Sequence, residues 1–324
     1  MAEKPPIILD GAFGTELERR GFQARLPLWS ALALIEAPEL VHTIHREYIA
    51  SGAQVITADT FRTTRYTLAK VGMADQAPEL ARMAIELARN ALPPSNFPHA
   101  VREGFDRPQP FAHFVGETGR GVMVAASVAP LEDCYRPDLR PPGEVLFREH
   151  AHTARTLRDA GAGLLLVETQ NTAREAQIAT EMALNMGLPV WTSLMPRSPA
   201  ELWNGDSLAD AALVAYALGA EAVLVNCCPP DLAEAAFQTL KQTLPGDILI
   251  GAYPNFRSPE GEPWNFSAPL TPEEFARWGQ HMADLGADIL GGCCGTTPAH
   301  IAALAEKLKV REARSRSHGE RTEN

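Results

Sequence analysis

Short apolar runs recur along the chain at intervals that suit a repeated strand and helix. Eight runs rich in Val, Ile and Leu predict strands, and they are IILD (7–10), QVITAD (54–59), VMVAASV (122–128), GLLLVET (163–169), PVWTSLM (189–195), AVLVNC (222–227), DILIGAYPN (247–255) and ADILGGCC (287–294). None of them alternates regularly with polar residues. Uninterrupted apolar strands are typical of a parallel sheet that is covered on both faces.

Segments with helical spacing of apolar residues lie between many of these runs. The clearest are 38–53, 77–92, 172–187, 207–219 and 271–286. Eight strands, most of them followed by a helix, favour a single α/β domain, a (β/α)₈ TIM barrel. We expect this barrel to span residues 1–310.

Two segments do not fit the barrel repeat. The connection 93–121 is rich in Pro and Gly, and it is either a lid over the barrel mouth or a solvated excursion. The end of the chain, residues 311–324, is charged and has no apolar face, so we expect a disordered tail there.

Composition and charge narrow the class of partner. The 324 residues are 45% hydrophobic and 21% charged, which suffices for one large core. The net charge of −11 argues against nucleic acid and against an anionic membrane surface, since both attract basic faces. Without a signal-like N-terminus or a membrane-length apolar run, we expect a cytoplasmic protein, a monomer or small homo-oligomer, that acts on small molecules.

Polar residues and thiols close most of the predicted strands. In a (β/α)₈ barrel the loops at the carboxyl ends of the strands form the active site. The residues at these ends are Asp10, Asp59, Ser127, Glu168, Asn226, Cys227, Asn255, Cys293 and Cys294. This is more polarity than core packing requires, so we expect one site at this rim.

Three of the five cysteines fall at the ends of nearby strands. Cys227 closes the sixth run and the adjacent Cys293 and Cys294 close the eighth, so one strand separates them at the same rim. Glycines at 291, 292 and 295 allow a bend in which both neighbours turn toward one point. Three thiols with a fourth position open are typical of a catalytic zinc site, whereas core packing is the alternative for a buried cysteine.

Other candidate residues fit ordinary packing better. Cys228 precedes two prolines, and we interpret it as a packed or spare thiol; Cys134 lies in a loop and we expect no ligand role for it. His42 and His45 form an HxxH pair, but on a helix of the outer ring and without a third ligand. We therefore expect both histidines to lie at the surface or in packing.

Several motifs resemble the homocysteine S-methyltransferase family, in matching order over nearly the whole chain. They are DGAFGTELERRG (10–21), LWSA (28–31), VNC (225–227), YPN (253–255) and GGCCGTTPAHI (291–301). The resemblance implies a zinc-dependent barrel enzyme that methylates the thiol of homocysteine to give methionine. By motif position it implies that Cys227, Cys293 and Cys294 bind Zn²⁺.

The amino-acid end of such a substrate needs its own partners. Glu168 and Asp10 suit an ammonium group, and the resemblance supports both as substrate contacts. The backbone amides from Gly11 to Thr15, at a predicted helix start, suit the carboxylate. A loop-capping role for Asp10 and a salt bridge at the barrel rim for Glu168 are the alternatives.

The methyl donor is the open part of the sequence interpretation. Asp59 stands where the family more often has Asn or Ser, and ASVAP (126–130) replaces a common GSIGP. S-methylmethionine is the preferred donor, with betaine, S-adenosylmethionine and a separate corrinoid protein as alternatives. Trp29, Tyr253 and Trp264 either attract a cationic donor by cation–π interaction or pack in the usual way.

Other functions stay open from the sequence. The same barrel could methylate a different thiol, or it could be a zinc-binding scaffold protein without catalytic activity. A thiol oxidoreductase is disfavoured because its cysteines are usually spaced CxxC. Asp10 and Glu168, at the same rim as the thiols, favour an enzyme over a scaffold protein.

Overall fold

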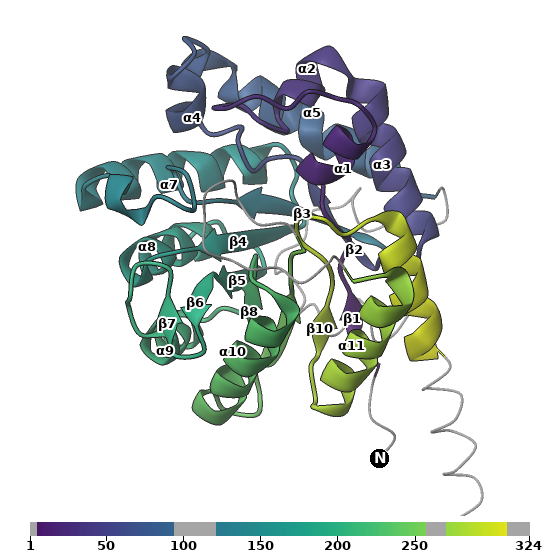
Figure 1. Cartoon of the computed structure of the whole chain (residues 1–324). Helices are drawn as coiled ribbons and strands as arrows, with labels where there is room; N and C mark the ends of the chain where they lie inside the picture. Colours follow the sequence, from purple (N-terminus) through teal and green to yellow (C-terminus); the bar gives the residue numbers. More distant parts are fainter. Residues whose placement is uncertain (1–4, 94–120, 257–269, 310–324) are drawn as a thin grey trace, which may run out of the picture.

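Eight parallel strands form the centre of the molecule (Figure 1). The computed structural model describes residues 5–93, 121–256 and 270–309. The strands are β1 (Ile7–Ile8), β2 (Val55–Ala58), β3 (Met123–Val128), β4 (Leu164–Gln170), β5 (Val190–Leu194), β8 (Ala222–Asn226), β9 (Leu249–Tyr253) and β10 (Ile289–Leu290). Their order in the sheet is β1-β10-β9-β8-β5-β4-β3-β2.

Backbone contacts between the first and last strands of this order close the sheet. Leu9 bridges Val55 in parallel, the amide of Asp10 donates to the carbonyl of Val55 at 2.9 Å, and that of Gln54 donates to Ile8 at 2.7 Å. The predicted (β/α)₈ barrel is confirmed, with each of the eight apolar runs contributing one strand.

Helices surround the strands on the outside of the barrel (Figure 1). They are α1 (Gly14–Arg19), α2 (Leu32–Glu36), α3 (Pro38–Ala50), α4 (Arg65–Ala69), α5 (Ala77–Asn90), α7 (Gly143–Asp159), α8 (Ala173–Leu184), α9 (Leu208–Leu218), α10 (Pro230–Thr243), α11 (Pro272–Asp284) and a final helical stretch, 298–309. The five predicted helical segments correspond to α3, α5, α8, α9 and α11. The described residues also contain two 3₁₀ turns (Ala74–Gln76 and Pro137–Leu139) and a small antiparallel pair, β6 (Pro196–Ser198) with β7 (Glu201–Leu202).

Side chains that alternate along each strand fill two separate apolar layers. In β4, Leu164 and Leu166 point into the barrel interior, where they pack with Trp191, while Leu165 and Val167 pack against the helices. Both sides of the strand are therefore buried. This is why the sequence shows continuous apolar runs instead of a polar alternation.

Capping residues fix where the outer helices begin. The side chains of Thr172 and Ser207 accept backbone hydrogen bonds at the starts of α8 and α9, and Thr271 with Glu274 forms a capping box at the start of α11. These caps end the strand-to-helix loops at defined points and so set the rim of the barrel. In the described parts of the chain, no helix has the length and apolarity that crossing a membrane requires.

Three sequence predictions fall on other parts of the chain. The connection 93–121, apart from its end residues, lies outside the described residues. The same holds for the tail 311–324 and for Trp264.

Candidate active site

A cavity of about 500 Å³ opens at the carboxyl ends of the barrel strands. Its volume lies within the range of about 300–1,000 Å³ that is common for small-molecule sites. Seven strand ends contribute to its wall, through Gly11, Thr57, Ser127, Glu168, Cys227, Tyr253 and Cys293. Six of the nine residues expected at this rim line the cavity, whereas Asp10, Asn226 and Asn255 do not.

The three thiols expected at this rim lie together in the cavity wall. The sulfur atoms of Cys227, Cys293 and Cys294 are all within 4.8 Å of one another, and they form the one such group of His, Cys, Asp or Glu found among the described residues. Ligands 2.3 Å from one ion in tetrahedral directions lie about 3.8 Å apart. The spacing of the three sulfurs fits a shared metal ion.

The backbone around the thiols requires glycine at two points. A Cβ atom on Gly292 would lie 2.3 Å from Thr296 Oγ1, and one on Gly291 would lie 2.5 Å from the Cβ of Leu9. The cysteine loop can therefore pass close to β1 only because these side chains are missing. Cys227 itself has a φ of 56°, a left-handed conformation that turns it out of the strand direction of β8.

Two polar side chains contact the sulfur of Cys227. The hydroxyl of Tyr135 lies 3.2 Å from it, and Nδ2 of Asn255 donates to it at 3.5 Å. Hydrogen bonds from Cys293 and Cys294, together with these two, hold the pKa of the Cys227 thiol well below its ordinary value. One thiolate stabilised by neighbouring donors is a suitable start for metal binding.

The two remaining cysteines lie outside the cluster. Cys228 is fully buried in the layer between sheet and helices, and burial raises its pKa. Cys134 forms part of the cavity wall and packs with Met195 and Cys227. Both fit the packing roles expected from the sequence, although Cys134 lies closer to the site than the sequence indicated.

The HxxH pair also belongs to packing. His45 is fully buried and its ring lies 4.8 Å from that of Phe13. Burial lowers its pKa to about 3, so the ring is neutral. Neither His45 nor the half-buried His42 is part of the thiol cluster.

Glu168 lines the cavity, where the hydroxyl of Tyr253 donates to its carboxylate at 3.2 Å. Burial raises its pKa to about 7, and the hydrogen bond from Tyr253 opposes this increase. A buried carboxylate with this pKa gains from a cationic partner because the cation favours its charged form.

Asn226 fixes the backbone beside Glu168. Its Oδ1 accepts from the amide of Thr169 at 3.1 Å and from the hydroxyl of Ser193 at 2.8 Å, and its Nδ2 donates to the hydroxyl of Thr169 at 2.9 Å. Thr169 has a φ of 58°, which this network stabilises. Asn226, a polar residue at a strand end, thus acts on the position of Glu168.

Asp10 lies behind the cavity wall. Its two carboxylate oxygens accept from the amide of Thr57 at 2.7 Å and from the Thr57 hydroxyl at 3.1 Å. Burial, with a contribution from the charge of Glu168, raises its pKa to about 8. Thr57 lines the cavity and Asp10 does not, so Asp10 reaches the site through Thr57.

Gly11 lines the cavity between two close neighbours. A Cβ there would lie 2.8 Å from both Tyr48 Oη and Thr296 Oγ1. The next amide, of Ala12, donates to Thr296 Oγ1 at 3.0 Å, so it is already occupied. Of the amides from Gly11 to Thr15 that the sequence predicted to bind a carboxylate, that of Ala12 is therefore not available.

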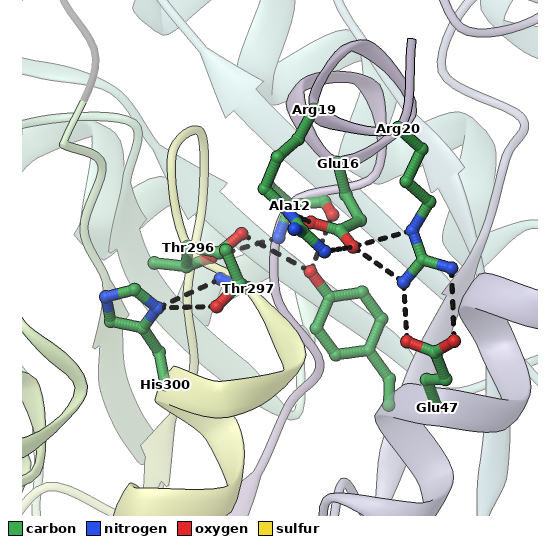
Figure 2. A network of polar contacts seen from close by, with 9 residues as sticks. Ala12, Glu16, Arg19, Arg20, Glu47, Thr296, Thr297 and His300 are labelled. Carbon is green, nitrogen blue, oxygen red and sulfur yellow. Dashed lines mark hydrogen bonds and ion pairs between the residues drawn. The ribbon is translucent and has the colours of Figure 1, made fainter. Parts of the chain in front are cut away.

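Figure 2 shows how the start of the chain is joined to the cysteine loop. Thr296 accepts the amide hydrogen bond of Ala12 (Figure 2). The same hydroxyl donates to the carbonyl of Cys293 at 2.7 Å. Tyr48 on α3 donates its hydroxyl to the carbonyl of Ala12 at 2.7 Å. The amide of Gly295 donates to the hydroxyl of Thr15 at 2.9 Å.

A charged network anchors α1, the short helix that follows this loop (Figure 2). Glu16, whose side chain is fully buried, accepts hydrogen bonds from Arg19 and Arg20, and Arg20 also pairs with Glu47 on α3. A buried carboxylate requires such partners. The network therefore fixes α1 against α3 beside the cavity.

The aromatic wall of the cavity differs in part from the prediction. Trp29 and Tyr253 line it, and Phe61 joins them, with its ring centre 6.2 Å from that of Trp29 in an edge-on arrangement. Phe61 follows Asp59 by two residues, so its place just after a strand end was the available signal. Asp59 also lines the cavity.

Sequence reasoning missed two further polar residues of the wall. Tyr135 follows Cys134 in the loop after β3, and Arg62 follows Phe61 after β2. Their positions just beyond strand ends could have indicated them. Only the folded loops bring their side chains to the cavity, because neither loop has a periodic pattern.

Comparisons with known proteins all indicate the same family. A sequence profile of the homocysteine S-methyltransferase family matches residues 7–308. The chain is 29% identical to a selenocysteine Se-methyltransferase of Brassica oleracea var. italica, over 94% of this chain and 90% of the relative. It is also 29% identical to the homocysteine S-methyltransferase YbgG of Bacillus subtilis, over 94% and 96% of the two chains.

A solved structure of this kind is similar over almost the whole chain. The metallated form of the homocysteine methyltransferase MmuM from Escherichia coli has a TM-score of 0.74 at 29% identity. The similarity covers 94% of this chain and 96% of that one. With a matching profile, full-length relatives and three thiols in one cavity, this chain belongs to the homocysteine S-methyltransferase family.

Proposed function

We propose that this methyltransferase moves a methyl group from a sulfonium or ammonium donor, with S-methylmethionine preferred, to the thiol of homocysteine. The products are methionine and the demethylated donor. One observation carries the proposal: three thiols that fit a shared metal ion lie in the same cavity as the buried carboxylate of Glu168. The metal would meet the sulfur end of an amino acid and the carboxylate its ammonium end.

The donor set favours zinc. Thiolates are soft ligands, and three of them with one open position are characteristic of catalytic Zn²⁺. Zn²⁺ held by Cys227, Cys293 and Cys294 would keep an added thiol in the thiolate form. The chain supplies hydrogen bonds from Tyr135 and Asn255 to the sulfur of Cys227, which restrain that ligand.

The remaining residues bind and orient the substrate. Glu168 faces the ammonium group, with Tyr253 holding its carboxylate in place. Asp10 supports this end of the site through Thr57, and Gly11 leaves room beside them. Methyl transfer is an in-line displacement, so alignment of acceptor and donor accounts for much of its rate.

The cavity also weighs against the alternatives. A zinc scaffold needs no opening of about 500 Å³ beside its thiols, and a thiol oxidoreductase needs no buried carboxylate for an amino group. Relatives named selenocysteine methyltransferases make a selenol a second acceptor to test. A corrinoid protein stays a possible donor.

The test is a donor and acceptor panel with the purified protein. Homocysteine or selenocysteine is combined with S-methylmethionine, betaine, S-adenosylmethionine or a methylated corrinoid protein, and the methylated product is measured by mass spectrometry. We expect methionine from homocysteine and S-methylmethionine, and about one zinc per chain by metal analysis. If product forms only with the methylated corrinoid protein, that protein is the donor in place of S-methylmethionine. Absence of methylated product with every donor and acceptor pair would refute the proposal.

A further inference from the structure

Asp59 carries an unsatisfied carboxylate oxygen in the cavity wall. It directly follows β2 and is 3% exposed. Ser30 donates to its Oδ1 at 2.6 Å, while Oδ2 is buried without a partner among the described residues. Such a group is costly unless a ligand completes it, because buried charges are normally paired.

Arg62, three residues later, is a buried cation in the same wall. It is 7% exposed; its Nη1 donates to the carbonyl of Glu132 at 3.4 Å, and its guanidinium lies 5.3 Å from the ring centre of Phe61. Its Nε has no partner among the described residues. The contacts that it makes are with a neutral carbonyl and a ring, so its charge is not balanced by a carboxylate.

The two charges do not neutralise one another. Within the described residues Asp59 is hydrogen-bonded to Ser30 alone, and Arg62 forms no ion pair. Asp133, a further acid of the cavity wall, accepts a hydrogen bond from the amide of Tyr135 and makes no ion pair with Arg62. Among the acids of the described cavity wall, Asp59 is the one with a buried oxygen that has no hydrogen-bond partner, and Arg62 is a buried cation without an ion pair to a described residue.

We propose that Asp59 and Arg62 form a subsite for a zwitterionic methyl donor, in which Asp59 faces the cationic group and Arg62 binds the carboxylate. The inference rests on the proposed function and defines its donor class. Trp29 and Phe61 line the same cavity and add aromatic surface that attracts a methylated cation; Trp29 precedes Ser30, the partner of Asp59, and Phe61 precedes Arg62. Homocysteine is assigned to Glu168 and the thiols, so the two substrates use different charged groups.

The charge balance of the reaction agrees with this assignment. The acceptor thiolate forms a new S–CH₃ bond while the bond from the donor's sulfur or nitrogen to its methyl group breaks. The electron pair of the broken bond stays on the donor atom, which loses its positive charge. Asp59 then loses that part of the attraction, and this favours exchange of the demethylated donor for a new cation.

Two conservative substitutions test the subsite. Arg62→Gln removes the positive charge and Asp59→Asn keeps the shape of the carboxylate. Arg46→Gln on α3 and Asp75→Asn in the 3₁₀ turn Ala74–Gln76, both at exposed positions, are the matched controls. Because a hydrogen bond to a charged group is lost, each test variant is expected to lose about 10- to 100-fold in kcat/KM for S-methylmethionine. The KM for homocysteine stays within about twofold.

A matched pair of donors isolates the role of Arg62. S-methylmethionine and its carboxamide differ only in the carboxylate, and the wild-type protein is expected to prefer the former at least tenfold. Arg62→Gln removes this preference and Arg62→Lys restores part of it. An unchanged preference in Arg62→Gln, or an increase in the homocysteine KM instead, would overturn the assignment.

Binding measurements separate this inference from the proposed function. Calorimetry with S-methylmethionine or betaine needs no methyl transfer, so it decides the subsite even if homocysteine proves not to be the acceptor. We expect binding to wild-type protein and loss of binding in both test variants, with unchanged metal content and a cooperative unfolding transition as controls for folding. Absence of zwitterion binding to wild-type protein, or equal binding to the variants, would refute the subsite.

Discussion

The hydroxyl of Thr296 joins Ala12 to the cysteine loop, although 284 positions separate these two residues in the chain. It accepts the Ala12 amide at 3.0 Å and donates to the Cys293 carbonyl at 2.7 Å. One side chain can reach both partners because β1 pairs in parallel with β10, so the loops that follow these two strands lie side by side. The loop after β1, which contains Ala12, and the cysteine loop after β10 are therefore mechanically coupled.

Replacement of Thr296 by Val is expected to loosen both loops at once. The variant keeps the shape but leaves the buried Ala12 amide without a partner, which costs about 1–3 kcal/mol. We expect a lower free energy of unfolding and weaker retention of metal, measured by urea titration and competition with a chelator. Thr43→Val, on the exposed face of α3, is the control; equal metal retention in the two variants would contradict the coupling.

Replacing any of the three clustered thiols should lower the metal content of the protein, whereas replacing Cys228 should not. Cys227→Ser, Cys293→Ser and Cys294→Ser are each expected to lose most of the bound zinc and all measurable methyl transfer, because a hydroxyl does not replace a thiolate ligand. Cys228→Ala should keep both, since that thiol packs between sheet and helices. Elemental analysis of the purified variants measures the zinc content. Zinc loss in Cys228→Ala with retention in Cys227→Ser would identify Cys228 as the ligand in place of Cys227.

Glu168→Gln is expected to weaken binding of the amino-acid substrate while zinc stays bound. The pKa of Glu168 is about 7, so its carboxylate becomes charged as the pH rises from 6 to 8 while the amino group of a free amino acid remains protonated. Methionine, which has no thiol to titrate, should therefore bind up to about tenfold more tightly at pH 8 than at pH 6 in the wild-type protein. Calorimetry should show little pH dependence in the variant; the same dependence in both proteins would assign it to another group.

Asp59 is expected to make the protein less stable as the pH rises. Burial raises its pKa from 3.8 to about 7, so between these values the folded state holds a proton that the unfolded state has released. Stability therefore falls with pH across this window, by about 1.4 kcal/mol per unit and proton. Urea unfolding from pH 6 to pH 8 should show a decrease about 1 kcal/mol larger in wild-type protein than in Asp59→Asn. Parallel curves would show that Asp59 is already ionised in the folded state.

The apolar runs and their spacing were sufficient to predict the barrel, because a parallel strand buried on both faces leaves a continuous apolar signal. The polar ends of these strands predicted where the site lies, since the carboxyl ends of parallel strands meet at one rim. The paired cysteines with their glycines, taken with Cys227 one strand away, predicted a thiol cluster on the same ground.

Only the tertiary structure decided which contacts the other residues of the site make. Asp10 lies behind Thr57, and Asn226 holds Thr169 beside Glu168; both depend on contacts between strands that are distant in sequence. Tyr135 and Arg62 reach the cavity through irregular loops, whose paths no hydrophobic period encodes. Whether a buried charge is balanced depends on every neighbour around it. For this reason the unpaired oxygen of Asp59 and the unpaired charge of Arg62 are recognised only in the folded chain.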